Sequence, residues 1–311
     1  MKYWKHIRKS WIAGLMAVGA CSPAAEKEAE KEQIVLEEAE EGTSLLWEVT
    51  GNGLNAPSYL FGTIHIIPKD KFVTGPAVEE AFNRTEELVL EIGNIRDTNA
   101  QLGMVGQMSL DSGSIKDHMS KEQYETLLHV VDSSLGISPK LFEMQYGKMR
   151  PFGLYQLMVS AESGFGDNKS YEMYFMDLAF QRETKTSGLE TMQEQLNIFN
   201  ELSYSDVADQ LISTLRAGES GANEMEELVN AYVSFDLGEL ERLTLSSDDP
   251  LTEHMDAFLY DRNARWIPTL DSLMHEKPCF VAVGAAHLPG EKGVIQLLEK
   301  EGYTVRPIRI K

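Results

Sequence analysis

The stretch CFVAVGAAHLPGEKGVIQLLEKEGYTVRPIRI, residues 279–310, predicts a strand, a helix and a second strand in succession. Residues 279–284 form a short apolar run, as in a strand that is buried on both faces. The segment after it has apolar residues at helical spacing up to Gly302, a residue type that often ends helices. A strand, a crossover helix and a strand of this size form a β-α-β unit with two parallel strands. The stretch therefore indicates an α/β protein.

A histidine stands between the first of these strands and the helix, and its setting recurs near the other end of the chain. His287 follows Gly284 by three residues, and in SYLFGTIHIIP (58–68) His65 follows Gly62 by three. Glycine at such a strand end allows a sharp turn and a close approach of the backbone to a ligand. Ligand sites in α/β folds lie beyond the carboxyl ends of parallel strands. The two G-x-x-H patterns therefore predict histidines that converge on one site.

The rest of the chain combines a few strands with long helical stretches. Further strands are expected at 44–50, 59–65, 87–93 and 184–190, the first two as a hairpin, with a helix around 75–84. Helical patterns fill about 95–182 and 200–275. The expected fold class is α/β, with a mixed, mostly parallel sheet formed from the N- and C-terminal parts of the chain. A large helical insertion is expected to cap the strand ends.

Composition limits the partners that the chain can have. With 311 residues, 42% of them hydrophobic, the chain is long enough to bury a substantial core. Its formal net charge of −21 repels phosphate backbones, so no nucleic acid partner is expected. Part of that charge lies in the glutamate-rich segment 26–42, which indicates a solvated tether.

The N-terminus predicts an exported protein with a lipid anchor. A basic region, a short apolar run and small residues form a secretory signal that is too short to span a bilayer. The ending VGAC (18–21) resembles the bacterial lipobox, in which the cysteine is acylated; a soluble secreted protein is the alternative. We therefore expect membrane attachment through Cys21, in the bacterial cell envelope and at its outer membrane. Cys279, the second cysteine, lies in an apolar strand and is expected to be a buried small residue without a disulfide.

These observations divide the chain into three expected parts. Residues 1–20 form a lipoprotein signal peptide, residues 21–43 an acidic tether, and residues 44–311 a catalytic domain.

Five polar residues form the candidate site. His65, Glu91, Glu190 and His287 fall at the ends of expected strands, and Arg262 lies on a helical stretch, YDRNARWIPTL (260–270). Imidazole nitrogen and carboxylate oxygen suit borderline divalent metals, and two histidines with one carboxylate leave positions open for water and substrate. Arginine is suited to binding a substrate carboxylate or developing negative charge. The alternative is ordinary structure: strand-end histidines often only donate hydrogen bonds, and an arginine can lie on a solvated helix face.

Four segments resemble the TraB/GumN family, which is related to the TIKI proteases and more distantly to the ChaN and erythromycin-esterase-like proteins. They are YLFGTIHIIP (59–68), SGLETMQEQLNIF (187–199), DRNARWI (261–267) and FVAVGAAHLPGEKGVIQLLEKEGYTVRPI (280–308). The resemblance implies an α/β fold built around paired G-x-x-H motifs and, for TIKI members, a metal-dependent peptidase that uses manganese or cobalt. It places the motif histidines on His65 and His287, the motif glutamate on Glu190 and the arginine on Arg262. Glu91 matches an acidic strand end of the family.

The sequence thus predicts a metal-dependent hydrolase, and among hydrolases a peptidase, acting on a peptide or a small molecule. The divalent ion, manganese or cobalt by resemblance and zinc or iron by donor type, is expected to be held by His65, His287 and Glu190. Glu91 is then the general base and Arg262 stabilises an oxyanion or holds a terminal carboxylate; the two glutamates could exchange roles. Two alternatives remain, a haem- or iron-binding lipoprotein without catalysis and a metal-free, esterase-like hydrolase with a histidine base.

Overall fold

The computed structural model describes residues 34–40, 42–93, 108–150, 153–154, 168–200, 203–217, 219–246 and 254–310. The expected signal peptide, the lipobox with Cys21 and most of the tether lie outside the described residues, as do parts of the helical insertion.

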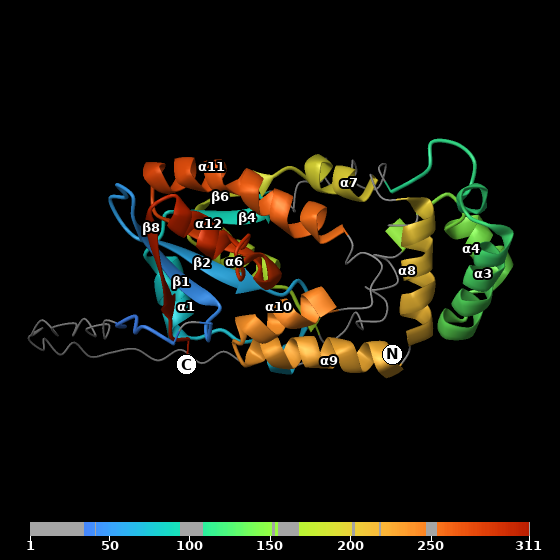
Figure 1. Cartoon of the computed structure of the whole chain (residues 1–311), viewed down its shortest axis with the longest axis horizontal. Helices are drawn as coiled ribbons and strands as arrows, with labels where there is room; N and C mark the ends of the chain where they lie inside the picture. Colours follow the sequence, from blue (N-terminus) through green and yellow to red (C-terminus); the bar gives the residue numbers. More distant parts are fainter. Residues whose placement is uncertain are drawn as a thin grey trace, which may run out of the picture. The chain divides into compact units, whose positions relative to one another are not determined.

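A six-stranded sheet forms the centre of the fold (Figure 1). Its strands, in spatial order, are β6 (Lys185–Glu190), β4 (Glu87–Ile92), β7 (Cys279–Gly284), β2 (Ser58–Thr63), β1 (Leu46–Gly51) and β8 (Tyr303–Ile308). Only β1 runs antiparallel to its neighbours, and the β6–β4, β4–β7 and β7–β2 pairs are parallel. The predicted mixed, mostly parallel sheet is confirmed, and β6 supplies one edge from the middle of the chain.

Local sequence explains how the sheet is connected. The β1–β2 hairpin turns at Asn52, with φ of 44°, between Gly51 and Gly53, which also have positive φ. Asparagine and glycine are the residues that adopt this left-handed conformation most readily. The β-α-β unit forms as predicted, with helix α12 (Val294–Lys300) followed by Gly302 at φ 93°. Its second strand, β8, is parallel to β7 but separated from it by the hairpin.

Helices account for most of the remaining described residues. They are α1 (Pro76–Asn83), α3 (Lys121–Leu135), α4 (Pro139–Gln145), α6 (Tyr171–Gln181), α7 (Met192–Asn200), α8 (Tyr204–Ala217), α9 (Glu219–Val233), α10 (Leu237–Ser246) and α11 (Asp261–Glu276). A two-stranded pair, β3 (Ile67–Pro68) with β5 (Asn168–Lys169), joins the segment after β2 to the start of α6. The side chain of Ser170 accepts a hydrogen bond from the Met173 amide and so caps α6.

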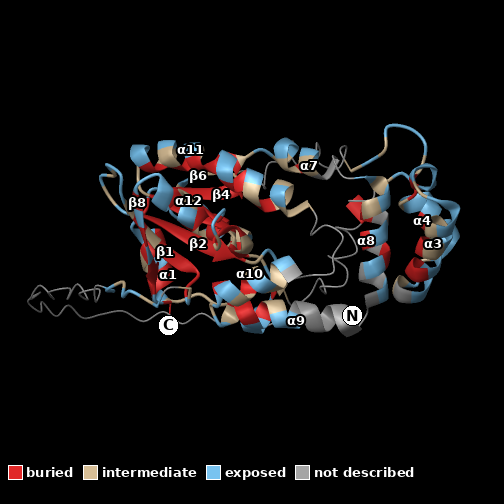
Figure 2. Cartoon of the chain, viewed as in Figure 1, coloured by how far each residue is buried: buried red, intermediate tan, exposed pale blue. Residues whose placement is uncertain are grey.

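The main core lies around the sheet: β2 is buried along its whole length, and β4 and β7 at every residue but the last (Figure 2). Aromatic rings of Phe61 and Phe280 on the strands pack with Phe175 of α6 and Phe82 of α1. Helix α11 adds the buried Trp266 to the same core. A second, smaller cluster joins α3, α4 and α8. The segments expected to cap the strand ends therefore include two helices, α6 and α11, that pack on the sheet itself.

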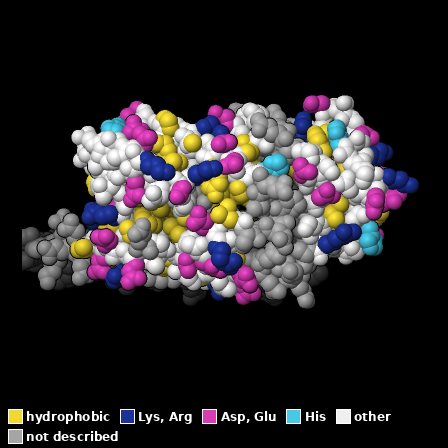
Figure 3. All heavy atoms as spheres, in the orientation of Figure 1, with side chains coloured by type: hydrophobic (Ala, Val, Ile, Leu, Met, Phe, Trp, Pro, Cys, Tyr) yellow, Lys and Arg dark blue, Asp and Glu magenta, His cyan; other side chains and the backbone are white. Residues whose placement is uncertain are grey.

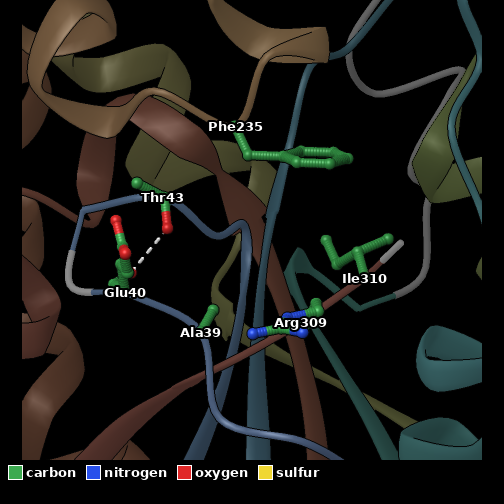
Figure 4. Close-up of a pocket in the computed structure, with 6 residues that line it drawn as sticks. All are labelled: Ala39, Glu40, Thr43, Phe235, Arg309 and Ile310. Atoms are coloured by element: carbon green, nitrogen blue, oxygen red, sulfur yellow. Dashed lines mark hydrogen bonds between the residues drawn. The ribbon is translucent and has the colours of Figure 1, made fainter.

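The packed part of the chain begins before the expected domain boundary at residue 44. Residues 37–39 lie along β8, where the Arg309 amide donates to the Glu37 carbonyl at 2.7 Å and the Ala39 amide donates to the Pro307 carbonyl at 3.0 Å. A pocket beside this segment is lined by Ala39, Glu40, Thr43, Phe235, Arg309 and Ile310 (Figure 4). None of these residues belongs to the predicted site. Within the part of the chain that the structure describes, no helix has the length and apolar character needed to cross a membrane.

Candidate active site

The sheet topology brings the four predicted strand-end residues to one edge. Strands β6, β4, β7 and β2 are adjacent and parallel, so their carboxyl ends lie together. Glu190 is the last residue of β6, Glu91 the second-last of β4, and His65 and His287 follow β2 and β7. This is the position at which α/β folds bind ligands.

Arg262 is the centre of a buried cluster of charges at this edge. Its Nη2 donates to Glu91 Oε2 at 2.5 Å and to Glu190 Oε1 at 2.6 Å, and its Nε lies 3.1 Å from Glu190 Oε1. Its Nη1 donates to the Phe258 carbonyl at 2.9 Å and to His287 Nε2 at 3.1 Å. A guanidinium has five N–H donors, and these contacts use all of them. Arg262 therefore has no donor left for a substrate and holds the two glutamates in place.

Helix α11 presents Arg262 to the strand ends. A π-helical turn, Asp256–Tyr260, leads directly into α11, and turns of this kind are frequent at functional sites. One turn further along, the Trp266 ring lies against the guanidinium, 4.8 Å from its central carbon, and its Nε1 donates to Glu190 Oε2 at 3.4 Å. Only 7% of the Arg262 side chain is exposed. The cluster is thus shielded from water, which strengthens its electrostatic interactions.

His287 is buried against the same cluster. Its Nδ1 lies 2.6 Å from Asn263 Oδ1, and its Nε2 lies 3.8 Å from Glu91 Oε1. Burial lowers the pKa of His287 to about 3, so the ring is neutral at physiological pH. A neutral imidazole retains one nitrogen lone pair, which is what a metal ligand or a general base requires.

His65 lies at the exposed side of the site, with 71% of its side chain accessible to solvent. Its Nδ1 is 3.0 Å from Oε1 of Glu172 on α6, which also accepts from Thr63 Oγ1 at 3.0 Å. The hydrogen bond to Glu172 raises the pKa of His65 to about 9. Among described residues His65 has no direct contact with His287, but the charges of Glu91 and Arg262 act on it. The structure thus brings His287, Glu91, Glu190 and Arg262 into contact and places His65 beside them.

Glu91 stays ionised although it is buried. Burial alone would raise its pKa, but the charges of His287, Arg262 and His65 and the hydrogen bond from the Gly284 amide, at 2.8 Å, hold the pKa at about 2. His287 is itself protonated at the pH where Glu91 titrates, so its charge contributes to this effect. Glu91 therefore presents a carboxylate toward the histidine at neutral pH.

The glycines of the two motifs leave space for neighbouring side chains and do not adopt a left-handed backbone conformation. Gly284 has φ of −51°, a value open to any residue. A Cβ atom there would lie 3.3 Å from Glu91 Oε1 and 3.4 Å from His287 Cδ2. A Cβ at Gly62 would lie 2.9 Å from Leu288 Cδ1, in the turn of the other motif. The chain turns after Gly284 without the backbone freedom that was expected of glycine, and the lack of a side chain there lets strand, carboxylate and histidine pack closely.

The donors at this edge match a divalent ion in kind. Both histidines have Nδ1 hydrogen-bonded to a side-chain oxygen, the arrangement usual for metal-ligating histidines that bind through Nε2. Of the two predicted carboxylates, Glu91 has an oxygen 3.8 Å from Nε2 of His287, whereas both oxygens of Glu190 face Arg262 and Trp266. Within the described residues, however, no three side chains of histidine, cysteine or acidic type are already grouped as metal ligands.

Sequence reasoning missed three residues that shape the site. Glu172 and Asn263 hold the histidines, and Gln195 of α7 donates to both Glu91 and Glu190 at 3.4 and 3.3 Å. Asn263 directly follows Arg262 in DRNARWI (261–267), a segment that the family resemblance already singled out, and this was a usable signal. Glu172 gave no comparable signal, because His65 is distant from it in sequence. Gln195 lies five residues after Glu190, but its second partner, Glu91, is on a strand distant in sequence.

Fold and site together define an α/β protein with a buried carboxylate–arginine–histidine cluster at the ligand-binding edge of its parallel strands. Residues 45–307 match the model of the TraB/PrgY/gumN family, and the chain belongs to this family. The resemblance predicted from the four sequence segments is confirmed.

Several relatives are metalloproteases by name. The chain is 25% identical to Metalloprotease TIKI1 of Danio rerio, over 84% of this chain and 62% of the relative. It is 26% identical to Metalloprotease TIKI1 of Homo sapiens, over 84% and 61%, and 24% identical to the Metalloprotease TIKI homolog of Amphimedon queenslandica, over 86% and 62%. The chain thus spans about three-fifths of the length of these relatives. No solved structure matches it significantly.

Proposed function

We propose that the protein is a metal-dependent hydrolase that cleaves peptides. The observation that carries this proposal is the pair of G-x-x-H histidines, each held at Nδ1 by a side-chain oxygen, at the strand edge where Glu91 and Glu190 also lie. The metalloprotease names of the relatives support the reaction class.

His65 and His287 would hold the divalent ion through Nε2, and at His287 the ion would replace the hydrogen bond from Arg262 Nη1. Of the two glutamates, Glu91 is the better candidate for the third ligand, because its Oε1 already lies 3.8 Å from His287 Nε2. When bound, such an ion polarises a carbonyl group and lowers the pKa of water. Manganese, cobalt, zinc and iron all accept this donor set, so the proposal names no single metal.

Arg262 acts in this proposal by positioning and not by binding substrate. Its bonds to Glu91 and Glu190 fix both carboxylates in a buried setting, and its charge helps to keep Glu91 ionised. Glutamine substitutions separate their roles. The glutamate whose replacement abolishes turnover but leaves metal affinity unchanged is the general base, and the one whose replacement lowers metal affinity is the ligand.

The test is metal content per chain in the purified protein, in the His65→Ala and His287→Ala variants, and in His129→Gln. His129 lies exposed on α3 and serves as the control. We expect both alanine variants to lose most of the bound metal and the metal-dependent cleavage of a peptide library, and the control to keep both. Folded alanine variants that retain metal at the level of the unaltered protein would refute the shared site.

A metal-free hydrolase is the second candidate. The observation that favours it is the buried, neutral His287, oriented by Asn263 as a base in a triad would be. It predicts that cleavage survives a chelator, whereas the metal-dependent proposal predicts loss with the chelator and recovery when metal is added back.

We further propose that Cys21 is acylated and attaches the protein to the bacterial envelope, at the outer membrane. The support is the sequence pattern alone, a basic region and an apolar run that end in VGAC. Cys21→Ser should move the protein from the membrane fraction to the soluble fraction. Unchanged membrane association of this variant would contradict the anchor.

A further inference from the structure

Asn263 is almost completely buried, and every polar group of its side chain is used. Its amide nitrogen donates to the Lys292 carbonyl at 2.9 Å and to the His287 carbonyl at 3.3 Å. Carbonyl oxygens can only accept, so these two bonds fix which end of the amide is nitrogen. The oxygen end then faces Nδ1 of His287, at 2.6 Å. Because an amide oxygen cannot donate, Nδ1 must carry the proton.

The other ring nitrogen of His287 gives the same result independently. Nη1 of Arg262 lies 3.1 Å from Nε2. A guanidinium has only donors, so Nε2 must accept and cannot carry a proton. The two neighbours, one that only accepts and one that only donates, therefore permit a single state of the ring: neutral, with the proton on Nδ1.

We infer that Asn263 is a positioning residue that fixes the tautomer of His287, so that the Nε2 lone pair faces the cluster of Arg262 and Glu91. Neutral histidine in water favours the opposite tautomer, with the proton on Nε2. Without Asn263 the buried Nδ1 proton would lose its acceptor at 2.6 Å, and only the longer contact with Arg262 Nη1, at 3.1 Å, would oppose the tautomer that water favours. A protonated Nε2 could neither accept from Arg262 nor bind a metal. The tautomer itself does not depend on the proposed function; only the use of the Nε2 lone pair as a metal ligand rests on it.

The tautomer can be measured directly in the full-length protein without added metal. Long-range ¹⁵N–¹H correlation spectra of protein labelled with ¹⁵N-histidine distinguish the two nitrogens, and a His287→Gln sample identifies the signal among the seven histidines. We expect His287 to be protonated on Nδ1 alone. A proton on Nε2 in the unaltered protein would overturn the inference whatever the variants show.

Two substitutions separate positioning from simple packing. Asn263→Leu removes the acceptor, and we expect protonation of Nε2 and a 10- to 100-fold loss of affinity for Mn²⁺, the probe ion, as is typical for a lost outer-shell partner. Asn263→Asp keeps an oxygen at Nδ1 but cannot donate to the carbonyls of His287 and Lys292. We expect it to keep Nδ1 protonated and to retain most of the Mn²⁺ affinity.

Each outcome has one meaning. If Asn263 served only to anchor the turn through its amide nitrogen, aspartate and leucine would fail alike, which would overturn the inference. The same holds if folded Asn263→Leu keeps the tautomer of the unaltered protein. If Asn263→Leu does not fold, the tautomer of His287 in Asn263→Asp decides: a proton on Nδ1 supports the inference, and a proton on Nε2 overturns it. If the tautomers behave as expected but the unaltered protein binds no metal and cleaves no peptide, the inference stands and the proposed function fails.

Discussion

Replacing Arg262 by methionine should destabilise the protein strongly, because it leaves two buried carboxylates without their counter-ion. The side chains of Glu91 and Glu190 are only 10% and 5% exposed, and both hydrogen-bond to Arg262. Removing one partner of a buried ion pair costs about 3–5 kcal/mol, and hydrogen bonds to charged groups contribute about 1.5–3 kcal/mol each. These contributions overlap, so we expect a loss of about 4 kcal/mol. Methionine keeps much of the volume of the arginine stem, so the change reports chiefly on the charge.

The matched control is Arg265→Met, which alters the same residue type on the same helix at an exposed position. Its effect should stay within about 0.5 kcal/mol. The assay is urea unfolding of the full-length protein, followed by far-ultraviolet circular dichroism, with equal m values required for comparison. Combining Arg262→Met with Glu190→Gln should recover about 1–3 kcal/mol, because one of the unpaired charges is then removed.

A loss below about 1 kcal/mol for Arg262→Met, or a loss equal to that of Arg265→Met, would refute the reasoning. It would mean that Glu91 and Glu190 reach water or another cation. The assignment of Arg262 as a positioning residue would then fail as well.

Three other outcomes follow from particular contacts. Gly188→Ala should cost about 1–3 kcal/mol or prevent folding, because a Cβ there would overlap the Gly93 amide nitrogen. Gly238→Ala, in a helix with room for the atom, should be neutral or stabilising in the same urea titration. The charged form of His275 donates from both ring nitrogens to backbone carbonyls, at 2.8 and 3.0 Å, and these bonds raise its pKa. The contribution of His275 to stability is therefore complete below the unfolded pKa of about 6.5 and is lost as pH rises through the folded pKa. The urea midpoint of His275→Gln should lack this dependence on pH. A chelator should not unfold the protein, and added Mn²⁺ at 100 times its dissociation constant should stabilise it by about 2.7 kcal/mol in thermal melts.

The sequence predicted where the site lies because that position depends only on where the strands end and on their parallel pairing. Apolar runs followed by His65, Glu91, Glu190 and His287 identify strand ends, and parallel pairing then places all four at one edge, whatever the order of the strands. The family resemblance, confirmed over residues 45–307, supported the same residues.

The contacts within the site could not be predicted in the same way. Arg262 was expected to face a substrate, but its donors are satisfied by partners far from it in sequence, on strands whose neighbours the hydrophobic pattern does not specify. The partner of His65, Glu172, lies at the start of a helix that an insertion separates from the strand. Periodicity reports which face of an element is buried, and it does not report which polar groups meet across elements.

The predicted reason for the motif glycines was also only partly correct, and the difference bears on how the site is built. We expected glycine for its backbone freedom, whereas Gly284 has an ordinary conformation, and Glu91 and His287 pack closely against the position that a Cβ would occupy.

Because the cation at this edge of the sheet is a side chain, Arg262, the protein can fold without a bound metal ion. Two carboxylates buried near one another repel, and a protein that relied on a bound metal to neutralise them would need that metal in order to fold. Here the guanidinium of Arg262 performs the neutralisation; it donates to the Phe258 carbonyl in the π-helical turn before α11 and packs on Trp266. Unlike the acidic and basic side chains interspersed over the visible face of the molecule (Figure 3), Arg262 and the two glutamates are buried. The fold can therefore keep Glu91 ionised beside the neutral His287 in the absence of any ligand, which is the preorganisation that an electrostatic site requires.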